Sequence, residues 1–264
     1  MQCNYCEWRC ELNEGKFGVC KMYYGENGLV KERFPNRWST CNISKIESIP
    51  FYHAYPGSRS MVIGTSSCNF ACRYCSNAYV AKEDPAKQHE GMFEFTPAEL
   101  VKMAQKQGCH NIVFNVNEPT VSLPSLIEVS QVARDIGMPM GCLTNAYMTE
   151  EATEIIAGIF SFINISLKGM SPEFYRDYIG IKNGEPVLRN IRRLAATNHL
   201  EVTVPIIQTI NDHELEEMTT FLAGIDREIP FHVFRLLPEY KMKEFEYPSI
   251  DRINDVLQLV REKL

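Results

Sequence analysis

The chain has 264 residues, of which 45% are apolar and 23% charged, and its formal net charge is −6. This length and apolar content suffice for one sizeable core, and wholesale disorder is disfavoured. The acidic balance argues against a general nucleic-acid surface. The N-terminus does not read as a secretory signal, and the longest apolar stretch, near 155–167, is too short and broken to span a bilayer. We therefore expect a soluble, cytoplasmic protein with no membrane partner.

A strand–loop–helix rhythm runs through the chain from about residue 56. The sequence predicts strands at 61–65, 111–116, 138–144, 162–168, 202–207 and 231–237. Helices are predicted at 96–107, 124–136, 150–159, 186–198, 212–227 and 249–263. The first of these helices has a clear start signal, because Thr96-Pro97-Ala98-Glu99 reads as a capping box with proline at the first helical position.

The predicted strands are near-continuous apolar runs such as IVFNV and VTVPII. Such runs indicate burial on both faces, and hence a parallel sheet covered by helices. Six strand–helix units are too few for a closed eight-stranded barrel, so we predict an α/β fold with a partial (β/α)6 TIM-like barrel. We assign residues 56–264 to this barrel and residues 1–55 to a cysteine-rich extension folded around a metal. By analogy with full barrels, the site belongs at the C-terminal ends of the strands.

Ten cysteines are present, and seven of them form two tight groups. Cys68, Cys72 and Cys75 follow the first predicted strand with the spacing C-x3-C-x2-C. Thiolates at this spacing can hold one cubane iron–sulfur cluster and leave its fourth iron open to another ligand. A zinc site that borrows a fourth ligand elsewhere is the alternative.

The surroundings of this motif carry a family resemblance. The segment IESIPFYHAYPGSRSMVIGTSSCNFACRYCSN, with Tyr74 before the last cysteine, resembles the signature of radical S-adenosylmethionine (SAM) enzymes. It is most similar to the pyruvate formate-lyase-activase-like branch, and within it to the radical SAM component of the AmmeMemoRadiSam system. The similarity extends over nearly the whole chain, including FNVNEPT, LTNAYMTEE, INISLKG, VPIIQTINDHELEE and FRLLPEYKM.

The resemblance implies an oxygen-sensitive [4Fe-4S] cluster on Cys68, Cys72 and Cys75 whose open iron binds SAM. It implies that Glu118 meets the SAM ammonium and that Lys168 faces SAM or substrate as a catalytic candidate. Reductive cleavage of SAM would release a 5′-deoxyadenosyl radical that abstracts hydrogen from a substrate. Further cofactor-binding candidates that match the family motifs are Tyr74, Asn117, Thr144 and Asn145. Ser166, two residues before Lys168, and Arg235, at the end of the sixth predicted strand, are added by their positions.

Two positions depart from the activase pattern. Activases place aspartates before the Thr-Asn pair and two residues before the lysine, where this chain has Leu143 and Ser166. Those aspartates help to hold a monovalent cation beside SAM. We therefore expect no such cation site here, and glycyl-radical activation becomes a less secure expectation.

The remaining cysteines form one further group of four and three isolated residues. Four thiolates at C-x2-C-x3-C-x9-C close a site that suits either structural zinc or an auxiliary [4Fe-4S] cluster, and the sequence leaves both open. We interpret the isolated cysteines as small core residues, and His53 and His232 as core or loop residues rather than ligands. The four clustered cysteines are Cys3, Cys6, Cys10 and Cys20, and the isolated ones are Cys41, Cys109 and Cys142.

Three functional hypotheses follow. The first is a radical SAM enzyme that receives electrons from a flavodoxin or ferredoxin and acts on an unidentified substrate, for which a protein backbone glycine is the activase-like candidate. The second is an accessory or sensor protein that binds SAM and the cluster without turnover. The third, RNA modification, is disfavoured by the acidic balance, and we expect no nucleic-acid partner.

Overall fold

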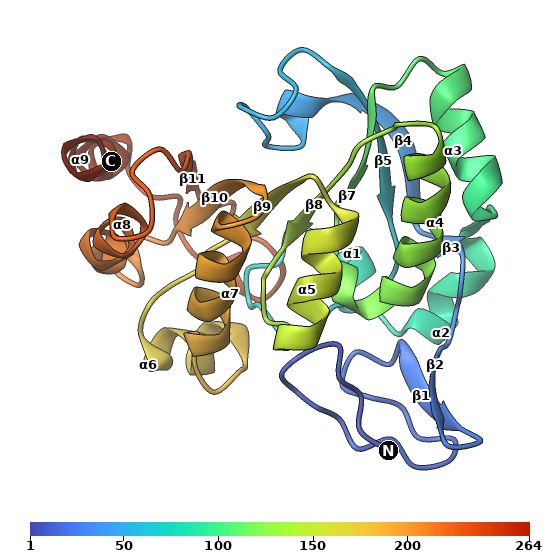
Figure 1. Ribbon diagram of the computed structural model, residues 1–264. Helices are drawn as coiled ribbons and strands as arrows, with labels where there is room; N and C mark the ends of the chain where they lie inside the picture. Colours follow the sequence, from blue (N-terminus) through green and yellow to red (C-terminus); the bar gives the residue numbers. More distant parts are fainter.

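The computed structural model describes residues 1–264 as an open α/β barrel (Figure 1). Its seven-stranded sheet has the order β11-β10-β9-β8-β7-β5-β4. Neighbouring strands from β5 to β11 pair in parallel, as predicted from their apolar runs. These parallel strands are β5 (Arg59–Gly64), β7 (Asn111–Phe114), β8 (Met140–Thr144), β9 (Phe162–Ser166), β10 (His199–Ile206) and β11 (Phe231–Arg235).

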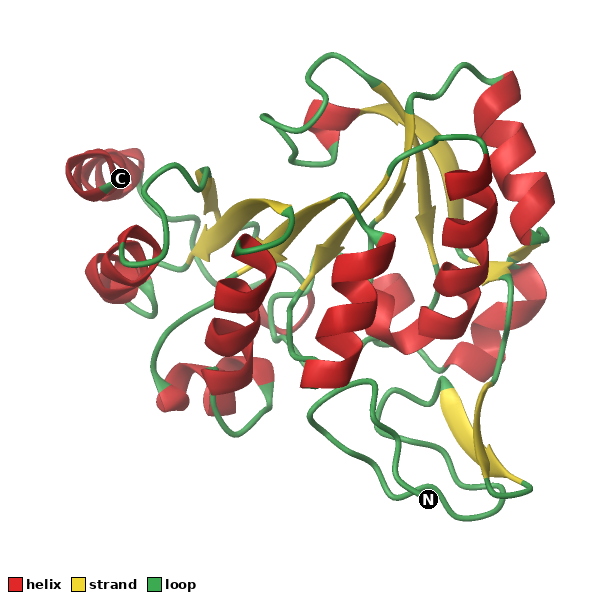
Figure 2. Ribbon diagram, viewed as in Figure 1, coloured by secondary structure: helices red, strands yellow, loops and turns green.

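Helices cover the outer face of this curved sheet (Figure 2). The predicted capping box at Thr96 is present, with the Thr96 side chain accepting from the Glu99 backbone and the Glu99 carboxylate accepting from Thr96. The longer helices are α3 (Pro97–Lys106), α4 (Leu123–Asp135), α5 (Glu150–Ile159), α7 (Glu185–Ala195), α8 (Leu215–Ala223) and α9 (Ile250–Lys263). Every helix is too short or too polar to span a bilayer. The partial TIM-like barrel predicted from the sequence is confirmed.

The structure adds elements that the sequence analysis did not predict. Strand β4 (Thr40–Lys45) joins the sheet antiparallel to β5, although it lies within the range assigned to the cysteine-rich extension. Short helices interrupt several loops, and two small ribbons flank the barrel. The ribbons are β1 (Tyr23–Glu26) with β2 (Leu29–Glu32) and β3 (Arg37–Trp38) with β6 (Phe93–Glu94), and the short helices include η1 (Ile46–Ser48), α1 (Ala78–Ala81), α2 (Pro85–Gln88), η3 (Pro119–Ser122), α6 (Pro172–Phe174), the π-helical η4 (Tyr175–Ile179) and η5 (Asp212–Glu214). The division at residues 55 and 56 stays a prediction.

Three predicted strands end two residues earlier than the apolar pattern suggested. Strand β7 stops at Phe114 and β9 at Ser166, while β11 stops at Arg235. The cause is clearest after β7, where Val116 adopts a positive φ of 82° and turns the chain out of the sheet. A β-branched residue rarely adopts this conformation, so the turn is held by its surroundings.

The cysteine-rich extension lies against the C-terminal ends of the strands (Figure 1). Trp8 Nε1 donates to the Asn69 carbonyl at 2.8 Å, and Ser67 Oγ donates to the Cys20 carbonyl at 2.6 Å. Tyr23 Oη donates to the Thr120 carbonyl at 2.9 Å. These contacts place the first four cysteines directly beside the loop that carries the C-x3-C-x2-C motif.

Candidate active site

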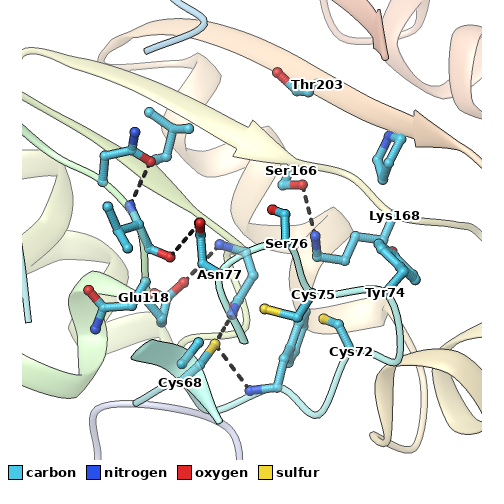
Figure 3. A pocket seen from close by; sticks show the side chains of 18 of the residues that line it. Cys68, Cys72, Tyr74, Cys75, Ser76, Asn77, Glu118, Ser166, Lys168 and Thr203 are labelled. Atoms are coloured by element: carbon cyan, nitrogen blue, oxygen red, sulfur yellow. Dashed lines mark hydrogen bonds between the residues drawn. The ribbon is translucent and has the colours of Figure 1, made fainter. Parts of the chain in front are cut away.

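One cavity of about 430 Å³ opens where the parallel strands end (Figure 3). Residues from the loops after β5, β7, β8, β9 and β11 contribute to its wall, as expected for a site at the C-terminal edge of such a sheet. It is lined by Cys68, Cys72, Cys75 and by all the predicted non-cysteine candidates, which are Tyr74, Asn117, Glu118, Thr144, Asn145, Ser166, Lys168 and Arg235.

The cysteine loop begins directly after β5, and the Asn117 side chain holds its first residues by hydrogen bonds. A Cβ atom on Gly64, the last residue of β5, would lie 2.6 Å from the Asn115 carbonyl oxygen, so only glycine fits there. Asn117 Oδ1 accepts from the Thr65 backbone N–H at 3.0 Å. Asn117 Nδ2 donates to Thr65 Oγ1 and to two backbone carbonyls, those of residues 66 and 67, at 3.0–3.1 Å. One side chain thereby fixes the three residues that precede Cys68.

The sulfur atoms of this loop fit the ligand set of a cubane cluster. Cys68, Cys72 and Cys75 are free thiols along one wall of the cavity (Figure 3). Cys68 Sγ accepts from the Phe70 backbone N–H at 3.5 Å and from Asn145 Nδ2 at 3.7 Å. Soft thiolates are the ligands that iron–sulfur clusters require, and N–H groups directed at the sulfurs tune such clusters.

Lys82 is a charged neighbour of this loop that the sequence analysis missed. Its side chain lines the cavity, and Nζ donates to the Phe70 carbonyl. Burial raises the pKa of Cys68 to about 12 while the Lys82 charge pulls it down. Burial lowers the pKa of Lys82, but the three thiols raise it above its ordinary value. A lysine at the end of a short helix ordinarily reads as solvated, so nothing in the sequence marked it.

Glu118 is a buried carboxylate that joins the loops after β7 and β8. Only 2% of the residue is exposed. Its oxygens accept from Thr144 Oγ1 at 2.9 and 3.1 Å, from the Asn145 backbone N–H at 2.8 Å and from Thr120. Burial raises the pKa of Glu118 above its ordinary value, and these hydrogen bonds offset part of that rise. The predicted residues Glu118, Thr144 and Asn145 are thus parts of one hydrogen-bonded network, whereas the Asn117 side chain bonds to the residues before Cys68.

Lys168 and Ser166 project into the opposite side of the cavity from the end of β9 (Figure 3). Lys168 Nζ donates to Ser166 Oγ at 2.9 Å and lies 5.7 Å from the centre of the Tyr74 ring. The Tyr74 hydroxyl is buried without a hydrogen-bond partner, and burial raises its pKa well above the ordinary value. Leu143 also lines this cavity and offers no ligand atom. The two positions where the activase pattern has aspartates, Leu143 and Ser166, therefore offer no carboxylate beside the Lys168 ammonium.

Arg235 lies at the rim of the cavity, at the end of β11. Its Nε donates to the Pro248 carbonyl at 2.6 Å, and its guanidinium lies 5.2 Å from the centre of the Tyr247 ring. These contacts commit part of the guanidinium to the loop before α9.

The first four cysteines converge on a second, smaller cavity. Cys3, Cys6, Cys10 and Cys20 all line it, and Cys10 Sγ accepts from the Val19 backbone N–H at 3.4 Å. Burial and the neighbouring thiols raise the pKa of Cys6 and Cys20. Four sulfurs held at one place are a complete ligand set for a metal or a cluster.

The fold and this cavity define a partial-barrel protein with a sulfur-lined pocket at the C-terminal edge of its parallel sheet. The model of the Radical SAM superfamily matches residues 62–222, and the chain belongs to that superfamily. This match confirms the superfamily predicted from the sequence. The cofactors of this chemistry are a [4Fe-4S] cluster and SAM.

Several known proteins are similar to this chain. An uncharacterised protein of Methanocaldococcus jannaschii is 27% identical over 267 residues, covering 100% of this chain and 78% of that protein. A GTP 3′,8-cyclase of Haemophilus influenzae is 25% identical and covers 81% of this chain, which spans 62% of the cyclase. Streptococcus suis SuiB bound to SAM has 13% identity and a TM-score of 0.58, covering 77% of this chain and 47% of SuiB. The structural likeness shows the shared fold.

Proposed function

We propose that this chain reductively cleaves SAM at a [4Fe-4S] cluster held by Cys68, Cys72 and Cys75. The observation that carries the proposal is the convergence of these three thiols and the polar ends of three strands on one cavity. When bound, the cluster and SAM supply a 5′-deoxyadenosyl radical that abstracts hydrogen from the substrate.

The side chains around the cavity divide the work of binding. Asn117 fixes the start of the cysteine loop, and Asn145 donates toward Cys68. Glu118 is the anionic group proposed to meet the SAM ammonium, because a carboxylate is a good acceptor for a charged donor. Lys168, held by Ser166, is the cation proposed to balance the SAM carboxylate.

The substrate is proposed only as a class. The segments from IESIPF to CRYCSN and the later INISLKG motif support the activase-like branch and, within it, the AmmeMemoRadiSam subgroup. The activase-like case favours a protein substrate, whereas the subgroup resemblance names no substrate, and a flavodoxin or ferredoxin is the proposed electron donor. The relatives named GTP 3′,8-cyclase are longer proteins, of which this chain spans 51–62%. We therefore leave a nucleotide substrate as the second outcome of a substrate screen.

Electron paramagnetic resonance of the reduced protein tests the cluster and its open iron together. Anaerobically reconstituted protein should show a [4Fe-4S]⁺ signal whose g-values change when SAM is added. The Cys72→Ala variant should lose that change because one cluster ligand is gone. The Cys41→Ala variant is the matched control, since Cys41 is half-buried and lies outside both cysteine groups. If the g-values of the wild-type signal do not change when SAM is added, the proposal is contradicted.

We also propose that Cys3, Cys6, Cys10 and Cys20 bind a metal, and that an auxiliary [4Fe-4S] cluster fits them better than zinc. Only one set of three or more potential metal ligands has all its ligand atoms within 4.8 Å of one another. That set consists of two histidines and a glutamate and contains no cysteine. No three of the four cysteine sulfurs therefore all lie within 4.8 Å of one another, whereas tetrahedral zinc with ~2.3 Å bonds holds its sulfurs ~3.8 Å apart. Iron and zinc analysis of a Cys68/Cys72/Cys75 triple alanine variant tests this. Zinc without iron would reverse the choice, and a folded metal-free variant would refute the site.

A further inference from the structure

We propose that His53, Glu201 and His232 bind a divalent transition-metal ion at the N-terminal end of the barrel. This site lies at the opposite end of the sheet from the cysteines. Glu201 is the third residue of β10 and His232 the second of β11, while His53 follows η1 in the light-blue segment of Figure 1. The sequence analysis interpreted both histidines as core or loop residues rather than ligands. His53 and His232 are 179 positions apart, so no local motif links them.

The ligand atoms are already grouped around one oxygen. His232 Nε2 lies 2.6 Å from Glu201 Oε2, and His53 Nδ1 lies 3.6 Å from the same oxygen. Tetrahedral zinc with ligand bonds of ~2.0–2.1 Å requires separations of about 3.3 Å between ligand atoms. The two observed separations lie on either side of that value, and an ion would replace the direct contact between Glu201 and His232.

The rest of the environment orients Glu201 as an anionic ligand. Its side chain is fully buried and accepts backbone N–H bonds from Tyr52 at 3.1 Å, His53 at 3.0 Å and Ala54 at 2.9 Å. Burial raises the pKa of Glu201, but these bonds and the imidazoles bring it well below the ordinary value. Groups that hold a ligating carboxylate in this way typically strengthen metal binding.

The exposure of the histidines leaves the site accessible to an ion. The His53 side chain is 57% exposed, whereas that of His232 is 13% exposed. Two imidazoles and one carboxylate with open positions suit Zn²⁺ or Fe²⁺ rather than Mg²⁺ or Ca²⁺, which favour oxygen ligands. The chemical class of the ligand is therefore a borderline transition-metal dication with water completing its coordination.

The site also lies directly beneath the large cavity. Thr203, two residues after Glu201 on the same strand face, lines that cavity together with Pro50 and Asn164. Asn164 Nδ2 donates to the Pro50 carbonyl at 2.8 Å and Asn164 Oδ1 accepts from Thr203 Oγ1 at 2.8 Å. An ion at Glu201 would thus tie the segment after η1 to β10 and β11 and fix the floor of the cavity.

Zinc titration of untagged, anaerobically loaded protein tests the proposal. With both cysteine groups occupied, wild type should bind one further equivalent of Zn²⁺ by calorimetry. Co²⁺ in its place should give visible d–d bands without thiolate charge-transfer absorption. At a hundredfold excess over Kd, Zn²⁺ should raise the Tm by about 5–10 °C.

Histidine variants identify the ligands. His53→Gln should fold normally, because the side chain is largely exposed, and should weaken the added Zn²⁺ equivalent at least about tenfold. His199→Gln is the matched control, since His199 Nε2 contacts the other carboxylate oxygen, Oε1, at 3.1 Å. It should retain the added equivalent. An absent further equivalent in wild type, unchanged binding in His53→Gln, or equal loss in His199→Gln would each overturn the assignment.

Discussion

Replacement of Asn117 by aspartate should disorder the cysteine loop while barely changing the size of the side chain. Aspartate keeps the acceptor for the Thr65 N–H, but it loses the –NH₂ group that donates to Thr65, Ser66 and Ser67. The two backbone carbonyls among these partners would then face a negatively charged oxygen instead of a donor. Asn117→Ala removes both the acceptor oxygen and the donor –NH₂ group.

The magnitude follows from the hydrogen bonds that are lost. Each neutral hydrogen bond contributes about 1 kcal/mol net, and an unsatisfied buried partner costs about 1–3 kcal/mol. Because these losses overlap on three adjacent residues, we expect a total of about 2–4 kcal/mol for either variant. In a chain of this size that corresponds to a fall in Tm of roughly 5–10 °C.

Iron content and Tm of the anaerobically reconstituted variants provide the assay. Both Asn117 variants should hold less iron at the Cys68 loop, and Asn117→Asp should be at least as impaired as Asn117→Ala. Asn115→Ala is the control, because Asn115 lines the same cavity but its side chain accepts only from the adjacent Val116 N–H. If Asn117→Asp has the same iron content and Tm as wild type, Asn117 does not hold the cysteine loop in place.

Three further predictions concern charge. SAM cleavage should not need sodium or potassium, because Leu143 and Ser166 offer no carboxylate and Lys168 supplies a cation; a several-fold rise in 5′-deoxyadenosine on adding millimolar potassium to a buffer of bulky organic cations would contradict this. Lys82→Met should lower the midpoint potential of the cluster, because a nearby cation favours its more negative reduced form; an unchanged potential in redox titration would count against it. Burial raises the pKa of Glu32 from 4.5 to about 7, so the native state binds this proton more tightly than the unfolded chain, and stability should fall by about 3 kcal/mol as pH rises between those values. Glu32→Gln should abolish that slope and exceed wild type in Tm at pH 8, and a Tm below wild type there would argue against it.

Local sequence signals predicted the barrel well. The strand and helix alternation, the capping box at Thr96 and the position of the cysteine loop after the first parallel strand all depend on residues close together in the chain. Strand β4 was missed because its six residues are only half-buried or exposed and lack a strong apolar pattern. Antiparallel pairing with β5 makes it a strand, and no local signal states that pairing.

The sequence predicted which residues form the site, but not the contacts that they make with one another. The family resemblance placed Asn117 beside the cofactor. In the structure, all hydrogen bonds of the Asn117 side-chain amide go to residues 65–67, about 50 positions earlier. Lys82 and the His53–Glu201–His232 group were missed for the same reason. Each becomes chemically informative only when tertiary contacts bring separated residues together.

The central claim is SAM cleavage at the Cys68, Cys72 and Cys75 cluster, and product analysis measures it most directly. Reconstituted wild type, reduced anaerobically with SAM, should form 5′-deoxyadenosine and methionine in equal amounts. The Cys72→Ala variant should form neither above the protein-free background, while the Cys41→Ala variant should match wild type. Full product formation in Cys72→Ala, or none in wild type with an intact SAM-binding cluster, would contradict the account, and the latter result would favour an accessory or sensor role.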